Sequence, residues 1–296
     1  MTHSHDTHQI SKRKLLITIV LNLIITAAQI IGGLISGSLA LISDAIHNLS
    51  DSVSIGLAYV AQILSGKPVT KKSTFGYKRA ETLAAFINSV ALIGISVYLV
   101  IEAVKRILTP QQVNADWMFW LGLLGLFANG ISVLILQKEK DNNINIKAAY
   151  LHLLGDALTS LAVIAGAVLI WLFEIYWIDP AVTILISIYL FIHSYDLLKE
   201  SVTILMQMAP SETDVSEIQK RLELETSLKN IHHIHLWRLT DKVAHFECHI
   251  DLEEDLRVSE TNETFGIVSK ILHDEFDIEH VTIQFEYESS HEENCE

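Results

Sequence analysis

Two histidines and two aspartates recur at the same spacing inside apolar stretches of the chain. His47 and Asp51 are four residues apart, and His152 and Asp156 repeat this spacing much later in the sequence. Residues at positions i and i+4 lie on one face of a helix, so each pair should present an imidazole and a carboxylate together. If the two helices face one another, all four side chains meet.

The chemistry that suits such a group is metal binding. Ionisable side chains cost on the order of 3 kcal/mol each in hydrocarbon on insertion scales, so these four should face a protein interior or a water-filled cavity and bind something. Imidazole nitrogen and carboxylate oxygen are ligands of tetrahedral Zn2+, whereas Ca2+ and Mg2+ prefer oxygen ligands alone. The alternative is that each pair only stabilises its own helix. Two matched copies favour one shared metal site.

Other polar residues in the same stretches have less direct roles. Asp44 lies three residues before His47 and one turn before Asn48. We expect Asp44 and Asn48 either to orient an imidazole N–H or to lie on a proton path to the site. Amides bind zinc poorly, so hydrogen bonds between helices are the expected role of three others, Asn22, Gln29 and Asn88.

The composition places these residues in a membrane. Half of the 296 residues are hydrophobic and the mean hydropathy is +0.35, which is too apolar for an ordinary soluble domain. We expect a bundle of six transmembrane helices, with spans at 15–35, 39–64, 82–108, 117–136, 148–173 and 178–198. Basic residues in the connections after the second and fourth spans predict that both termini are cytosolic in a multi-pass protein of the cell's inner membrane.

The net charge of −14 is concentrated near the C-terminus. Residues 209–296 carry 7 basic and 22 acidic side chains, whereas residues 1–208 carry 14 and 13. This acidity argues against nucleic acid as a partner. The spacing of apolar residues predicts a small α+β domain with a helix, two strands, a helix and a strand, at 213–227, 231–239, 243–252, 258–276 and 281–287. About eighty residues make a marginal core, so we expect the domain to form a homodimer.

The chain therefore divides into four parts. Residues 1–14 form a cytosolic arm, 15–208 the membrane domain, 209–288 the cytosolic domain and 289–296 a tail. The histidines of the arm, His3, His5 and His8, either bind metal weakly or have no particular role. The two cysteines, Cys248 and Cys295, give no sign of a disulfide framework, as expected for a reducing cytosol.

Taken together, these features resemble the cation diffusion facilitator family, most closely its bacterial zinc, cadmium and cobalt efflux branch. The likeness rests on the six spans, the paired His-x-x-x-Asp motifs, the run Phe-Gly-Tyr-Lys-Arg-Ala-Glu at 75–81 and the His-Leu-Trp at 235–237. It implies a homodimeric antiporter that exports divalent metal ions in exchange for protons, with a metallochaperone-like αββαβ cytosolic domain. It also implies that the paired motifs form the transport site, and His47 in place of an aspartate favours zinc there.

Some members of the family carry a second, regulatory metal site in the cytosolic domain, and we expect one here, although the last strand offers Glu286 in place of their histidine and aspartate. Its candidate ligands are His233, His235, His249, Glu286, His291 and Cys295. The alternative is that these are surface residues and a tail thiol. His232, His245 and His273 are interpreted as ordinary surface residues. Some members carry a further site between the second and third spans, but residues 67–72 offer no ligand, so we expect none there.

Two other functions remain as alternatives. An intramembrane zinc enzyme would need an open coordination position and a neighbouring base, and no His-Glu-x-x-His occurs, so we expect no enzyme activity. A membrane-anchored metal sensor would have no need of four ligands inside two spans. The expected ion is Zn2+, although Cd2+ and Co2+ accept similar ligands.

Overall fold

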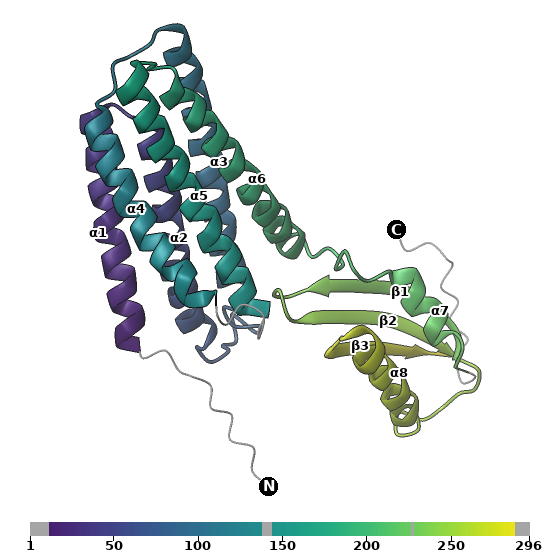
Figure 1. Cartoon of the computed structure of the whole chain (residues 1–296). Coiled ribbons are helices and arrows are strands. Elements are labelled where there is room, and N and C mark those ends of the chain that lie inside the picture. The colour runs from purple at the N-terminus through teal and green to yellow at the C-terminus, as the bar shows by residue number, and fades with distance from the viewer. Residues whose placement is uncertain (1–11, 138–143, 226–227, 288–296) are drawn as a thin grey trace. The chain divides into compact units, whose positions relative to one another are not determined.

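A computed structural model describes residues 12–137, 144–225 and 228–287. Long helices come first in the chain, and a small sheet with two shorter helices follows them (Figure 1). The helices and strands are α1 (Lys12–Ser36), α2 (Leu39–Ser65), α3 (Ala80–Leu108), α4 (Ala115–Leu136), α5 (Ile144–Phe173), α6 (Ile178–Leu205), α7 (Val215–Leu222), β1 (Leu228–Arg238), β2 (Ala244–Leu252), α8 (Thr261–Phe276) and β3 (His280–Glu286). A helix is present at each of the six expected spans.

Four of these helices are long and apolar enough by themselves to cross a membrane. Within the described part of the chain the segments are Ala80–Leu108, Ala115–Leu134, Tyr150–Phe173 and Ile178–Leu205. Large apolar side chains such as Trp120, Leu134 and Leu185 are exposed on them, as expected of surfaces that face lipid. Helix α2 has a similar length, but Asp44 and Asp51 interrupt its apolar sequence.

The start of α2 is held by a residue of α6. Asp179 is completely buried, and its carboxylate accepts hydrogen bonds from Ser38 Oγ at 2.5 Å, from the Leu39 amide at 2.9 Å and from the Ala40 amide at 3.2 Å. These amides belong to the first turn of α2, where backbone N–H groups lack partners within the helix and a negative charge is favourable. The first turns of α2 and α6 are therefore joined.

The C-terminal sheet has the order β1-β2-β3. Strand β1 is antiparallel to β2, and β2 is parallel to β3. One face of the sheet packs against α7 and α8. Its core contains Phe246, Cys248 and Ile250 of β2 together with Leu222 of α7 and Leu272 of α8. Alternation along β2 leaves the other face polar, and the expected αββαβ domain is confirmed.

Strand β1 contains an irregularity that matters for the polar face. His232 pairs with His249 and His235 with Glu247, so three steps along β1 correspond to two steps along β2. His233 lies inside this β-bulge with a left-handed backbone, φ 50°. An inserted residue of this kind breaks the regular alternation of side chains along a strand.

The chain separates into two compact units, which do not coincide with the two halves of the sequence. One unit reaches to Leu57 and resumes from Ile87 to Asp196, and the other contains Ala58–Phe86 and the chain from Leu197 onward. Most of the bundle therefore lies in the first unit, and the sheet lies in the second.

Candidate functional site

The four side chains of the paired motifs lie together between α2 and α5. His47 Nε2 is 2.8 Å from Asp156 Oδ1 and 3.9 Å from Asp51 Oδ2. His152 Nε2 is 3.4 Å from Asp51 Oδ2 and 3.7 Å from Asp156 Oδ2. Regular helical geometry places each histidine beside the aspartate one turn later, and the two helices bring the pairs face to face.

Three of the four side chains, His47, Asp51 and Asp156, have ligand atoms that all lie within 4.8 Å of one another, and His152 lies beside them. Ligand atoms about 2 Å from a zinc ion are roughly 3.3 Å from one another, because that is the edge of the tetrahedron they form. The four nitrogen–oxygen distances in the group lie on both sides of this value. Two neutral imidazoles and two carboxylates can therefore hold a divalent metal ion after small side-chain movements.

The group is buried on one side and open on the other. The side chains of His47 and Asp156 are 3% and 4% exposed, whereas those of Asp51 and His152 are 28% and 36% exposed. An ion bound here would keep access from one direction only. Such one-sided access is what a site that exchanges its ion needs at each stage of a cycle.

A buried hydrogen-bond network lies next to the group. The Asp44 carboxylate accepts hydrogen bonds from Thr159 Oγ1 at 2.8 Å, from Ser160 Oγ at 3.1 Å and from Gln29 Nε2 at 3.2 Å. Asn48 Nδ2 donates to Gln29 Oε1 at 3.3 Å, and Asn48 is buried as well. The network thus ties α1, α2 and α5 together, and the partners of Asp44 are hydroxyl and amide groups rather than an imidazole.

The amides that were expected to link helices behave in two ways. Gln29 joins α1 to α2 as described, and Asn88 of α3 donates to Ser50 Oγ at 3.1 Å and to Ser54 Oγ at 2.8 Å. Both expectations are confirmed. The side chain of Asn22 lies outside the described residues.

Helix α6 adds two residues that the paired motifs did not reveal. The Tyr189 ring lies 6.0 Å from the His47 ring, and the His193 ring lies 6.4 Å from the His152 ring. Gly155 makes room for the tyrosine, because a Cβ atom there would be 2.8 Å from Tyr189 Oη. The available sequence signal was a lone histidine in an apolar span, which is a functional hypothesis by default.

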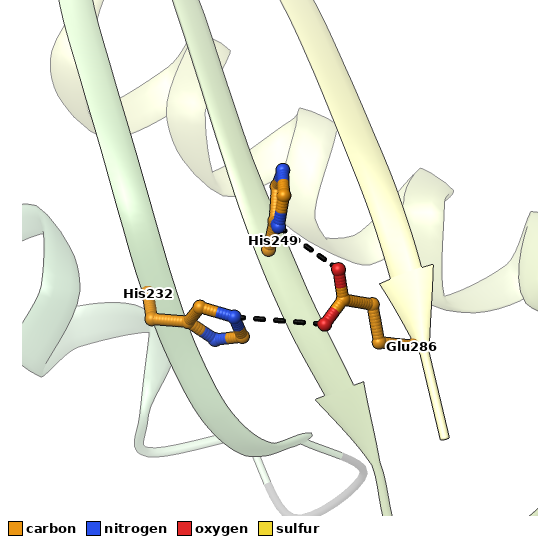
Figure 2. A group of neighbouring side chains, drawn as sticks. All are labelled: His232, His249 and Glu286. Carbon is orange, nitrogen blue, oxygen red and sulfur yellow. Dashed lines mark ion pairs between the residues drawn. The ribbon is translucent and has the colours of Figure 1, made fainter. Parts of the chain in front are cut away.

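A second group of potential ligands lies on the polar face of the sheet. His249 Nδ1 is 2.9 Å from Glu286 Oε1, and His232 Nε2 is 3.6 Å from Glu286 Oε2. Figure 2 shows the three side chains converging from β1, β2 and β3. The Glu286 side chain is only 7% exposed, so its charge sits at the floor of the group where a cation would be stabilised.

The β-bulge affects which histidines of β1 lie near the group of potential ligands on the polar face. His233 Nε2 lies 3.2 Å from His235 Nε2, and the His233 ring is 4.7 Å from the His249 ring. Of the expected residues, His249 and Glu286 therefore belong to the group, and His233 and His235 lie beside it. The structure also places His232 in the group, although the sequence had indicated an ordinary surface residue. The other two candidates, His291 and Cys295, lie outside the described residues.

Cys248 has an environment that weakens it as a ligand, and His245 lies in a separate cluster of rings. Cys248 is buried in the core of the sheet, and burial raises the pKa of its thiol to about 12, so the thiolate needed for metal binding is not formed near neutral pH. His245 stacks on His280 with ring centroids 4.5 Å apart. Burial and the neighbouring positive groups lower the pKa of His245.

Comparison with known families covers almost the whole chain. The family model described as the cation efflux transmembrane domain matches residues 15–206. A second model, described as the cation efflux protein cytoplasmic domain, matches residues 210–288.

Individual relatives agree in length as well as in sequence. The metal cation efflux system protein CzcD of Cupriavidus metallidurans is 37% identical over 284 residues, which cover 96% of this chain and 89% of the relative. The cadmium, cobalt and zinc/H(+)-K(+) antiporter of Bacillus subtilis is 38% identical over 299 residues, or 100% and 95% of the two chains. The zinc transporter ZitB of Escherichia coli is 35% identical over 302 residues, or 99% and 93%.

Proposed function

The chain belongs to the cation efflux family of divalent-metal transporters, and on that premise we propose that it exports Zn2+ from the cytosol in exchange for protons. It is a multi-pass membrane protein and not an enzyme. Its C-terminal part is the family's cytoplasmic domain, and the transporter is a homodimer. The proposal adds the ion, the coupling and the residues.

The observation that carries the proposal is the meeting of two imidazoles and two carboxylates between α2 and α5. We assign the transported ion to His47, Asp51, His152 and Asp156, whose nitrogen and oxygen atoms suit tetrahedral zinc. Relatives are named as transporters of zinc, and of cadmium and cobalt beside it. Cd2+ and Co2+ are therefore further substrates of the same site.

Exchange with protons follows from the ligands themselves. Zinc binds neutral imidazole and ionised carboxylate, so metal ions and protons compete for the same four side chains. Imidazole has an ordinary pKa of about 6.5, within reach of cellular pH. When the site faces the cytosol, zinc displaces protons, and when it faces the more acidic outside, protons displace zinc. Rocking of the helices around the site alternates its access.

The membrane orientation is part of the proposal. Lys67, Lys71, Lys72, Lys78 and Arg79 follow the second span, and Lys138, Lys140 and Lys147 follow the fourth. Positive residues are enriched in cytoplasmic connections. Both termini and the acidic C-terminal domain then lie in the cytosol, and the protein resides in the cytoplasmic membrane.

We assign a regulatory role to the group on the sheet. His232, His249 and Glu286 form its centre, with His233 and His235 beside them. Three such ligands leave room for a fourth from the tail, the partner subunit or water. Zinc binding here would stabilise the form of the cytosolic domain that favours transport when the metal concentration is high.

The decisive experiment measures zinc and protons together. Inside-out vesicles that contain the protein receive zinc on the outside and hold a pH-sensitive dye inside, with the Asp51→Ala variant in parallel. We expect zinc entry with alkalinisation of the lumen, and loss of both in the variant. Zinc entry without a pH change would refute proton exchange. No transport, with zinc still bound to the sheet group, would point to a membrane-anchored sensor instead.

A further inference from the structure

We infer that His193 of α6 is a metal-loading residue, which lies with Asp51 and His152 at the open side of the transport site and binds an ion there before all four transport ligands hold it. This inference rests on the proposed function. It adds a third helix to a site built from α2 and α5.

The arrangement has two tiers at different depths. Asp51 lies one turn nearer than His47 to the C-terminal end of α2, and His152 lies one turn nearer than Asp156 to the N-terminal end of α5. Successive spans run in opposite directions, so these two ends lie on the same side of the bundle. Four residues of helix rise by about 6 Å, so the backbone of His47 and Asp156 forms an inner tier and that of Asp51 and His152 an outer tier, although the side chains of the two tiers meet.

Helix α6 repeats the pattern with its own pair. His193 lies one turn nearer than Tyr189 to the C-terminal end of α6, which is on the same side of the bundle. The Tyr189 ring contacts the inner tier at His47, and the His193 ring stacks on His152 of the outer tier with an angle of 20° between their planes. The two rings of α6 also stack on each other, 6.2 Å apart.

Exposure increases in the same direction. The inner side chains are almost completely buried, Asp51 and His152 are about one-third exposed or less, and His193 is exposed. The site therefore opens toward the outer tier. An ion that enters from this side meets His193 and His152 before it meets His47.

The chemistry of His193 fits this position. Its neighbours Phe191 and Ile192 are apolar and exposed, and an imidazole among them is costly unless it faces water or binds a ligand. Two imidazoles that share one zinc ion have ring centroids roughly 5–6 Å apart, given a zinc–nitrogen distance of about 2 Å. The 6.4 Å between His193 and His152 lies within a small rotation of such a pair. A hydrated ion could thus exchange water for ligands one at a time.

The test separates loading from chemistry at the inner site. Initial rates of zinc uptake into inside-out vesicles are measured against free zinc for wild type, His193→Asn and His193→Cys, with Ile192→Ala as the matched control on the neighbouring exposed position. We expect His193→Asn to raise KM roughly tenfold and to keep kcat within about a factor of two, because it removes binding that is not specific to the later steps. The thiolate of His193→Cys is a zinc ligand and should restore a low KM.

Each outcome decides the inference. An unchanged KM in His193→Asn, or an equal loss in the asparagine and cysteine variants, would overturn it. A fall in kcat with constant KM, together with weaker cross-linking of the homodimer, would assign His193 to subunit contact instead. If wild type moves no zinc, or Asp51→Ala moves as much as wild type, the proposed function fails first. If Asp51→Ala loses zinc transport while His193→Asn transports zinc normally, the proposed function stands and only the loading role of His193 is contradicted.

Discussion

The helical group and the sheet group use similar ligands but are built in different ways. In the membrane bundle, two pairs at i and i+4 meet because α2 and α5 are regular helices, and the periodicity of a helix fixes which side chains share a face. In the sheet, the potential ligands lie around one inserted residue in β1. Where the secondary structure is regular, sequence spacing predicts which side chains form a site. A local irregularity such as a β-bulge can bring a neighbouring histidine into the site instead of the predicted one.

The largest effect is expected at the carboxylate of the sheet group. Glu286→Gln keeps the size of the side chain but removes the charge that faces His232 and His249. We expect zinc affinity of the sheet group to fall ten- to hundredfold, by roughly the amount that loss of groups around a metal site costs. Zinc titration of the full chain in an Asp51→Ala background measures this affinity. Glu254→Gln, on an exposed residue of the same domain, should leave it unchanged.

The β-bulge itself can be tested at His233. Its left-handed backbone suits glycine and costs a β-branched residue about 1–2 kcal/mol. Both His233→Gly and His233→Val remove the imidazole, so the loss of the ring is common to them and their difference reports the backbone strain together with the added valine side chain. We expect zinc to bind the valine variant roughly tenfold more weakly than the glycine variant in the same titration. Equal affinities would mean that the bulge does not determine the ligand set.

The helical group should be sensitive to the hydrogen-bond network around Asp44. A Cβ atom at Gly125 would lie 2.5 Å from Gln29 Nε2 and 3.1 Å from Ser160 Oγ, two partners of Asp44. Loss of one such hydrogen bond is worth about 1 kcal/mol, so we expect Gly125→Ala to slow zinc transport roughly fivefold. Gly130→Ala on the same helix meets open space and serves as the control. The same slowing in both variants would point to helix α4 rather than the network.

The smallest effect concerns acid stability of the cytosolic region. Burial lowers the pKa of His245 below 6.5. As the pH drops through 6.5, His245 is protonated in the unfolded chain but not in the folded chain, so the stability of the folded chain falls. The Asp274 carboxylate raises the pKa of His273, which has the opposite sign: its contribution is present at low pH and is lost as the pH rises. Thermal unfolding of the full-length protein measures how far the Tm falls between pH 7.5 and pH 5.5. We expect this fall to be smaller in His245→Gln than in wild type by about 1–2 °C. His273→Gln should show a larger loss, and identical slopes for the two variants would contradict this assignment.

Sequence periodicity was sufficient for most of the architecture. Hydropathy predicted the six helices, and alternation predicted the strands to within a few residues, since β2 was expected at 243–252 and is observed at Ala244–Leu252. The start of α5 was predicted later than Ile144, because the residues at 144–147 are too polar for a hydropathy window although they continue the helix.

The side chains that sequence could not assign depend on contacts between distant segments. The role of Tyr189 is visible only because Gly155 lets α5 and α6 approach at the level of His47. His232 was interpreted as a surface residue because the candidate ligands came from the family resemblance, which does not reveal the β-bulge in β1. Neither feature has a local signature, since glycines occur in many helices and histidines in many strands without such contacts.

The carboxylate of Asp179 fixes one end of α2, so a tilt of the helix would move its other end. It pins the first turn of α2 to α6 through Ser38, Leu39 and Ala40, whereas Asp51 lies about 18 Å further along the helix axis. With a pivot at that end, a tilt of about 10° moves Asp51 by about 3 Å, roughly the spacing of two ligand atoms around one ion. A small change in the angle of α2 would thus become a displacement of several ångström at Asp51, while the hydrogen bonds of Asp179 at the other end of the helix stay intact.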